Sequence, residues 1–157
     1  MNKKIALLAI CLFLLSGCGS KQVGQVDMDQ LAADGNYHYR NESLGFSVTL
    51  PKEFQYYQFN KKFASDYTEL DILVPTADRS YPQEVAGYAT VLVVRVYDSK
   101  AWQGIADNSG DKIAFEKIGE KNGKTYAIKL WDKVSSDWAK KWTPKMKDDL
   151  IKSIAIQ

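Results

Sequence analysis

Cysteine and histidine are nearly missing from this sequence. The only cysteines are Cys11 and Cys18, and the only histidine is His38. If Cys11 is removed with an export signal and Cys18 is modified, as the N-terminal motif below indicates, no free thiol remains. Disulfides, cysteine catalysis and cysteine metal sites are then excluded. We therefore expect no metal, no cofactor, and a fold that depends on its apolar core.

The predicted mature chain also has no net charge. Lys3 and Lys4 account for the whole formal net charge of +2, and from residue 18 onward the basic and acidic side chains balance. Nucleic-acid binding requires a concentrated basic face, so we expect no nucleic-acid partner. Apolar residues make up 45% of the chain and aromatic residues 12%, which is ample for a packed core and argues against disorder.

The only long apolar run is too short to cross a membrane. It extends from Ile5 to Leu15, whereas a membrane-spanning helix needs about 20 apolar residues. The run follows a positively charged start, Met1–Lys4, and leads into Leu15-Ser16-Gly17-Cys18. This order is typical of an export signal, and the last four residues resemble the lipobox of bacterial lipoproteins. The alternative is an ordinary secretory signal with a chance cysteine.

The lipobox resemblance implies cleavage before Cys18 and acylation of its thiol. Residues 1–17 are then a lipoprotein signal peptide, residues 18–36 a lipidated tether and residues 37–157 a single domain. Two or more acyl chains anchor a protein stably where one is marginal. We therefore expect an extracytoplasmic protein, lipid-anchored to a bacterial membrane, either the outer face of the cell membrane or the outer membrane.

Three segments of the domain have the period-two pattern of β-strands. Residues 46–50 and 67–74 alternate apolar and polar side chains, whereas residues 88–97 are apolar on both faces. The faces of this last segment are Leu92, Val94 and Val96 on one side and Ala89, Val91 and Val93 on the other. A strand of this kind is covered from both sides and is expected inside a sheet.

Weaker signals complete the expected fold. Asn122-Gly123 predicts a tight hairpin because both turn residues tolerate positive φ. Further extended segments are predicted at 37–41, 54–59, 113–118, 124–131 and 153–157.

Helical signals fall at three places. Asp98-Ser99 can cap a short helix over residues 100–106, Ser135 or Ser136 opens a helical turn, and Thr143-Pro144 starts a second helix. The sum is an α+β fold, with an antiparallel sheet of about six strands covered by helices on at least one face.

Two segments resemble PsbP-like domains. Residues 39–51 (YRNESLGFSVTLP) are similar to the entry hairpin of that superfamily, and residues 150–156 (LIKSIAI) to its terminal helix and strand. The superfamily includes the photosystem II extrinsic protein, a Ran-binding relative and many bacterial lipoproteins. The resemblance implies an αβα sandwich used mainly for binding, and it transfers no functional residue, since one fold hosts many functions.

Few residues have a pattern that indicates catalysis or metal binding. Asp107–Asp111 resembles a calcium loop but lacks the spaced ligands and the bidentate glutamate. His38 has no recognisable catalytic partner, and we expect it to be structural or solvated. Glu69 and Asp71 share one strand face and could form a glycosidase pair. The interpretation we favour is that both are solvated acids on an outer face.

The aromatic residues are the strongest candidates for ligand binding. Trp138 and Trp142 are one helical turn apart, and at least one of them is predicted to pack onto the sheet. Trp102 is expected to anchor its short helix in the core. An exposed platform of tryptophan and tyrosine could stack on sugar rings or a partner protein. The candidates for that role are Trp131, Tyr56 and Tyr57.

The leading functional hypothesis is a non-enzymatic binding or accessory module, monomeric, with an envelope protein or a glycan as its partner. The alternatives are a carboxylate-dependent cell-envelope hydrolase and a structural component of an envelope complex. An aromatic groove without clustered acids favours the binding module. Two carboxylates that converge in a deep cleft favour the hydrolase.

The lipid anchor can be tested by removing its acceptor. Cys18→Ala is expected to leave the chain unprocessed or to release it from the membrane, because no thiol remains to be acylated. Cys11→Ala is the matched control and should leave acylation intact. Detergent partitioning and mass spectrometry of the native protein measure the outcome, and an unmodified Cys18 at the mature N-terminus would contradict the prediction.

Overall fold

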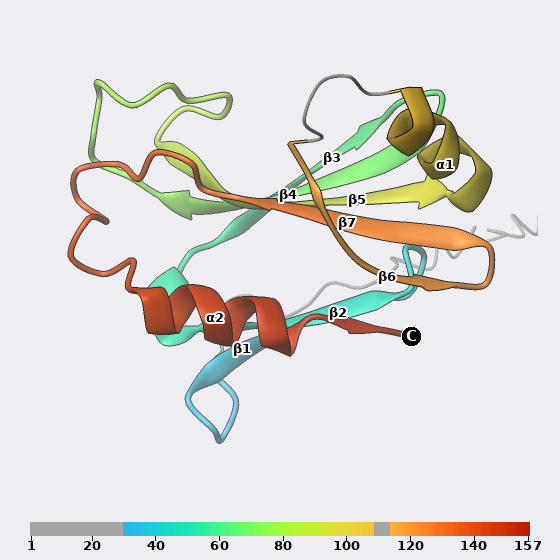
Figure 1. Cartoon of the computed structure of the whole chain (residues 1–157). Coiled ribbons are helices and arrows are strands. Elements are labelled where there is room, and N and C mark those ends of the chain that lie inside the picture. The colour runs from blue at the N-terminus through green and yellow to red at the C-terminus, as the bar shows by residue number, and fades with distance from the viewer. Residues whose placement is uncertain (1–29, 109–113) are drawn as a thin grey trace, which may run out of the picture.

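The computed structural model describes residues 30–108 and 114–157, which form two antiparallel sheets and two α-helices. The smaller sheet has the order β1-β2-β8 and the larger one β3-β4-β5-β7-β6. In Figure 1 the smaller sheet and α2 lie on one side of the larger sheet, and α1 lies on the other. None of the helices in the described part of the chain could cross a membrane. The elements are β1 (Asn36–Asn41), β2 (Phe46–Pro51), the 3-10 helix η1 (Lys52–Phe54), β3 (Gln58–Phe63), β4 (Tyr67–Pro75), β5 (Tyr88–Asp98), α1 (Ser99–Asn108), β6 (Glu116–Lys121), β7 (Lys124–Leu130), α2 (Pro144–Ser153) and β8 (Ala155–Ile156).

The smaller sheet is a hairpin that the C-terminal residues extend. β1 and β2 pair along their whole length, and the alternating side chains Phe46, Val48 and Leu50 are buried as their pattern predicts. β8 pairs with the start of β2. Further along, the Ser153 hydroxyl accepts a hydrogen bond from the Thr49 amide at 3.1 Å. The last residue of α2 thus contacts β2 beyond the two residues that pair with β8.

Strand β5 lies inside the larger sheet, as predicted, between β4 and β7. A β-bulge changes the predicted assignment of its faces. Ile72 pairs with Leu92 and Leu73 with Thr90, so Val91 is an extra residue and points to the same core as Leu92. The expectation of two fully covered faces is therefore wrong, because on the second face Thr90 and Val93 are only half-buried.

Helix α1 covers one end of this second face. The Lys100 amide donates to Asp98 Oδ1 at 2.9 Å, so Asp98 caps the helix as its sequence predicts. Trp102 is buried against Tyr97, with ring centroids 5.1 Å apart. These two rings and Ala127 form a small second core. Trp102 is thus the core anchor that was expected.

The predicted hairpin and the second helix are confirmed. Asn122 and Gly123 both have positive φ, 53° and 73°, in the turn between β6 and β7. Thr143 is the N-cap of α2, and its Oγ1 accepts from the Met146 amide at 3.2 Å. Leu150 on the apolar face of the helix is buried. Local capping and turn chemistry therefore decide where these elements begin and end.

The tryptophans after β7 pack into the main core. Trp138 and Trp142 lie on a single helical turn, closed by a 2.9 Å bond from the Trp142 amide to the Trp138 carbonyl. Trp138 is buried, and its ring meets Phe54 edge-on at 5.5 Å and Trp131 at 5.8 Å. The prediction that at least one of this pair packs onto the sheet is confirmed.

Two further expectations are corrected. In place of the single sheet of about six strands, the described residues form eight strands in two sheets, because β2 pairs with the distant β8 and not with the strands that follow it. Residues 54–59 are not one extended segment. η1 ends at Phe54, and Tyr56 has a left-handed φ of 63° before β3 begins at Gln58.

The packing of β5 can be tested with a leucine pair. Leu92 is 0% exposed, and Leu92→Ala is expected to lower the free energy of unfolding by about 2–5 kcal/mol because it leaves a cavity between the sheets. Leu31, which is 48% exposed, is the matched control, and Leu31→Ala should change stability by less than about 0.5 kcal/mol. Equal effects in urea unfolding would refute the interior position of β5.

Candidate functional site

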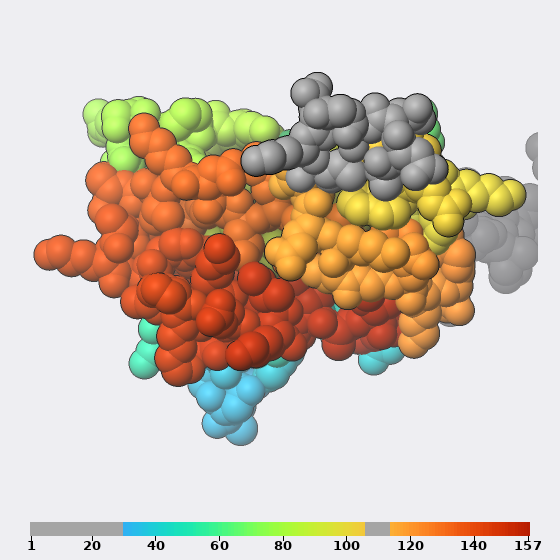
Figure 2. Space-filling view, viewed as in Figure 1, coloured from blue at the N-terminus to red at the C-terminus, as the bar shows by residue number. Residues whose placement is uncertain are grey.

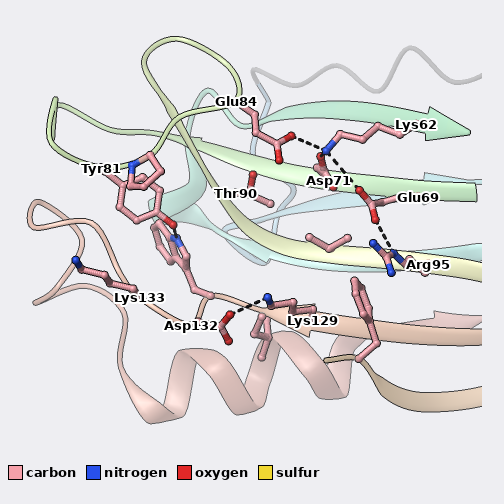
Figure 3. Close-up of a pocket in the computed structure, with 15 residues that line it drawn as sticks. Lys62, Glu69, Asp71, Tyr81, Glu84, Thr90, Arg95, Lys129, Asp132 and Lys133 are labelled. Atoms are coloured by element: carbon pink, nitrogen blue, oxygen red, sulfur yellow. Dashed lines mark hydrogen bonds and ion pairs between the residues drawn. The ribbon is translucent and has the colours of Figure 1, made fainter. Parts of the chain in front are cut away.

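A cavity of about 380 Å³ lies on the face of the larger sheet that points away from the smaller sheet. Its floor is formed by β3, β4, β5 and β7, and its rim by the loop of residues 76–87 and by residues 131–133 (Figure 3). Ligand pockets typically have volumes of about 300–1,000 Å³. The cavity occupies the part of the second face that α1 leaves open.

The charged floor follows from strand alternation. Leu70 and Ile72 point into the core, so their neighbours Glu69 and Asp71 point to the opposite face. In the sheet register Glu69 lies beside Lys62 of β3 and Arg95 of β5. Cross-strand neighbours on one face are close enough to form ion pairs. The alternation thus aligns cation, anion and cation across three adjacent strands.

Lys62 is at the centre of three carboxylates (Figure 3). Its Nζ lies 2.8 Å from Asp71 Oδ2, 3.4 Å from Glu69 Oε1 and 2.5 Å from Glu84 Oε2. Arg95 Nε donates to Glu69 Oε2 at 2.6 Å. The ammonium and the guanidinium therefore neutralise most of the carboxylate charge within the site.

Arg95 is held between two aromatic rings. Its guanidinium carbon lies 4.2 Å from the centroid of the Tyr67 ring and 3.9 Å from that of Phe115. Together with the bond to Glu69, these contacts fix the orientation of the guanidinium. Arg95 thus forms a rigid end wall of the cavity on the side nearest α1.

Glu69 and Asp71 have opposite pKa shifts although they are two residues apart. Burial acts to raise the pKa of Glu69, but the hydrogen bond and charge of Arg95, with the charge of Lys62, outweigh it and lower the pKa. Burial raises the pKa of Asp71, and the negative charges of Glu69 and Glu84 add to this rise despite the nearby Lys62. Glu69 is thus the more acidic carboxyl of the two.

Asp71 is the most deeply buried charged group of the cavity wall. It is 1% exposed, and both of its carboxylate oxygens lack a hydrogen bond within the described part of the chain. The partner of the carboxylate is the ammonium of Lys62, which forms an ion pair with Oδ2 at 2.8 Å. The expectation that Glu69 and Asp71 are solvated acids is therefore wrong, because Lys62 and the 76–87 loop cover this side of the sheet.

An aromatic pair forms the opposite wall. Trp131 Nε1 donates to the Tyr81 hydroxyl at 2.6 Å, and the two rings meet edge-on with centroids 6.2 Å apart. Trp131 is 9% exposed, so most of its ring belongs to the core and only an edge reaches the cavity. The wall joins the 76–87 loop to the end of β7.

Two aspartates fasten the rim loops to each other. Asp78 accepts from the Ser136 amide at 2.9 Å, and Asp137 accepts from Thr76 Oγ1 at 2.8 Å and from the Ala77 amide at 2.9 Å. The hydrogen bond from the Ser80 hydroxyl, followed by that from the Ser136 amide, holds the pKa of Asp78 below its usual range. Burial acts to raise the pKa of Asp137, but the bonds from Ala77 and Thr76 outweigh it and lower the pKa. Figure 2 shows the green 76–87 loop packed directly against the orange segment after β7. The rim is therefore preformed.

The three predicted aromatic residues do not form one platform. Tyr57 is 1% exposed in the core, and burial raises the pKa of its hydroxyl to about 12. Tyr56 is 59% exposed, and Trp131 lies at the cavity. Among the described residues no ring contact joins Trp131 to either tyrosine. Ligand binding at these residues stays a prediction; of the three, Trp131 lines the cavity described above.

The other sequence candidates lie elsewhere. His38 is exposed, and its ring nitrogens lie 2.9 Å from Asp34 Oδ2 and 3.2 Å from Thr49 Oγ1. Cys18 and most of the Asp107–Asp111 segment are outside the described residues. Within residues 30–108 and 114–157, no three His, Cys, Asp or Glu side chains gather as a metal site.

The sequence interpretation missed most residues of the cavity, among them Lys62, Tyr81, Glu84 and Arg95. Arg95 was visible as a charge in an apolar strand, opposite Glu69 once β4 and β5 pair. Tyr81 and Glu84 lie in a loop without periodicity, and no local signal indicates where such side chains point.

Comparison with protein-family models, curated proteins and solved structures finds no match for this chain.

The Lys62–Asp71 pair gives a pH-dependent prediction. Lys62→Met is expected to cost about 3 kcal/mol of stability at pH 7, because it leaves a buried carboxylate without its cation. An acid whose pKa is raised by folding stabilises the fold below its unfolded pKa and loses that contribution as the pH rises through its folded pKa. The deficit relative to the parent should therefore shrink as the pH falls to about 4.

Two control variants belong to this experiment. Lys62→Arg keeps the charge and should retain most of the stability. The double variant Lys62→Met/Asp71→Asn replaces the buried charge with a neutral amide and should recover most of the loss. Urea unfolding across pH measures all three, and a deficit of Lys62→Met that is independent of pH would show that Asp71 is not the group left uncompensated.

Proposed function

We propose that this chain is a lipid-anchored extracytoplasmic binding module and that the cavity on the larger sheet is its binding site. The observation that supports binding most directly is the preformed cavity, whose charged groups other than Lys133 are already paired with one another. Concave sites with a few fixed polar groups and an aromatic wall are the usual form of small-ligand sites.

The pairing of the carboxylates argues for binding over catalysis. A general acid or base must reach the proton that it transfers, at about 2.6–3.2 Å. Asp71 has no solvent-accessible oxygen, and both oxygens of Glu69 face the cations of Lys62 and Arg95. A substrate would first have to break these ion pairs. The carboxylates are therefore better suited to hold Lys62 and Arg95 in place.

A carboxylate-dependent cell-envelope hydrolase is the second candidate. The observation in its favour is the convergence of Glu69 and Asp71 in one cavity, with pKa shifts in opposite directions. Such a pair is the pattern of a general acid beside an ionised carboxylate. Hydrolysis of a glycan or ester panel by the purified chain, abolished by Asp71→Asn, would favour this candidate over a binding module.

The anchor and the domain type complete the proposal. The lipobox at residues 15–18 supports a lipid anchor on a bacterial membrane, with an envelope protein or a glycan as partner. A PsbP-like αβα sandwich is proposed on the resemblance of residues 39–51 and 150–156 to that superfamily. The observed hairpin of β1 and β2, and the succession of α2 and β8, are compatible with it.

Blocking the cavity tests the binding function. Val93 lies on its floor, in register between Asp71 and Lys129, and Val93→Trp would fill the space without removing a charge. The full chain, crosslinked in native membranes, should capture one or more envelope components, and Val93→Trp should reduce that capture by about tenfold or more.

The control is Lys61→Trp, an exposed change on β3 that does not line the cavity, and its capture should match that of the parent. Melting temperatures close to that of the parent would show that both variants fold. Undiminished capture by Val93→Trp would exclude the cavity as the binding site. It would instead favour a structural component of an envelope complex that uses another face.

A further inference from the structure

We infer that the ligand of this cavity is a neutral saccharide. The inference rests on the proposed binding function and assigns the chemical class of the ligand. It is derived from three properties of the cavity, which are the internal pairing of its charges, the apolar strip along its floor, and the hydroxyl groups beside that strip.

Except for Lys133, the charged side chains that line the cavity form ion pairs within the described part of the chain. Lys62 is bound by three carboxylates, Arg95 by Glu69, and Lys129 lies 2.8 Å from Asp132 Oδ2. Away from Lys133, a charged ligand would have to compete with one of these pairs, and breaking the buried pairs of Asp71 with Lys62 and of Glu69 with Arg95 is costly. A neutral ligand avoids this cost. Its hydroxyl groups can use the donors and acceptors that remain at the edges of the paired groups.

The floor between the charged groups is apolar. Val93 lies there, in register between Asp71 and Lys129, and the edge of Trp131 continues the apolar strip to the aromatic wall. Leu130 also borders the cavity, but its side chain packs toward the main core. A purely apolar ligand does not suit the site, because the floor is bordered by ion pairs on both sides. A sugar ring has C–H groups on its faces and hydroxyl groups around its edge. It therefore matches an apolar strip with polar borders.

Hydroxyl groups of the protein also border the strip. Thr90 lines the floor next to β4. The Tyr81 hydroxyl accepts the bond from Trp131, and its own proton has no acceptor among the described residues. A hydroxyl can both donate and accept, so it pairs with a sugar hydroxyl in either direction. The charged groups, by contrast, are limited to one role each: an ammonium or guanidinium can only donate to a sugar hydroxyl, and a carboxylate can only accept from it.

The test is calorimetric titration of the full chain in detergent. The probes are the neutral disaccharides cellobiose, chitobiose, maltose and lactose. Glucosamine, glucuronic acid and glycylglycine serve as cationic, anionic and zwitterionic comparisons. At least one neutral disaccharide should bind with a Kd of about 1 mM or tighter, and its affinity should change by less than about twofold between low and high salt, because no net charge is neutralised on binding.

The variants locate the binding. Val93→Trp should weaken it by about tenfold or more, and Lys61→Trp should leave it within about twofold. Tyr81→Phe removes the hydroxyl but keeps the ring, and it should weaken binding without changing its salt dependence. Binding that survives Val93→Trp would place the saccharide elsewhere and overturn the inference.

The remaining outcomes separate the inference from the proposed function. If none of the neutral disaccharides binds, or if a charged probe binds more tightly than all of them, the ligand is not a neutral saccharide. The binding module still stands in that case, provided that Val93→Trp abolishes capture in native membranes. If capture and titration are both insensitive to Val93→Trp, the cavity is not a binding site and both proposals fail.

Discussion

The buried carboxylate of Asp71 constrains the whole outer face of the larger sheet. A charge at this depth is tolerated only beside a cation, and Lys62 on the neighbouring strand supplies one. The same ammonium draws Glu69 and Glu84 toward it, and Glu69 in turn orients Arg95. An apolar layer cannot close over such a network, so α1 covers only one end of the face. The open remainder is the cavity.

The strands of the larger sheet could be predicted from the sequence because their signals are local. Alternation identified β4, the apolar run on both faces identified β5, and Asn122-Gly123 identified the hairpin of β6 and β7. β3 was not predicted with its observed bounds. Alternation also placed Glu69 and Asp71 on the same face, opposite Leu70 and Ile72. It could not indicate whether that face was covered. Coverage depends on the 76–87 loop and on Lys62, which come from other parts of the chain, so the two acids were wrongly expected to be solvated.

The two-sheet arrangement was beyond the sequence patterns for a related reason. β8 has only two residues, yet it pairs with β2, which lies more than 100 residues earlier in the sequence. No periodicity can be detected over so short a segment, and its partner is decided by where α2 ends. The β-bulge at Val91 had the same effect on a smaller scale, because one extra residue moves each following side chain to the other face. Ala89 and Leu92 thus share a core although their spacing predicts opposite faces.

The aromatic residues link the core to the cavity in a way that favours a preformed site. Trp131 contacts Trp138 and Trp142 on its core side and Tyr81 on its cavity side. The Trp138 indole also donates to the Pro75 carbonyl, where the 76–87 loop begins. The rim is therefore fastened to the core by the same rings that stabilise the fold. A ligand entering between Trp131 and Arg95 meets walls that are already ordered, so little conformational entropy is lost on binding. Binding of a small ring in this cavity, as proposed, would therefore require little rearrangement of its rim.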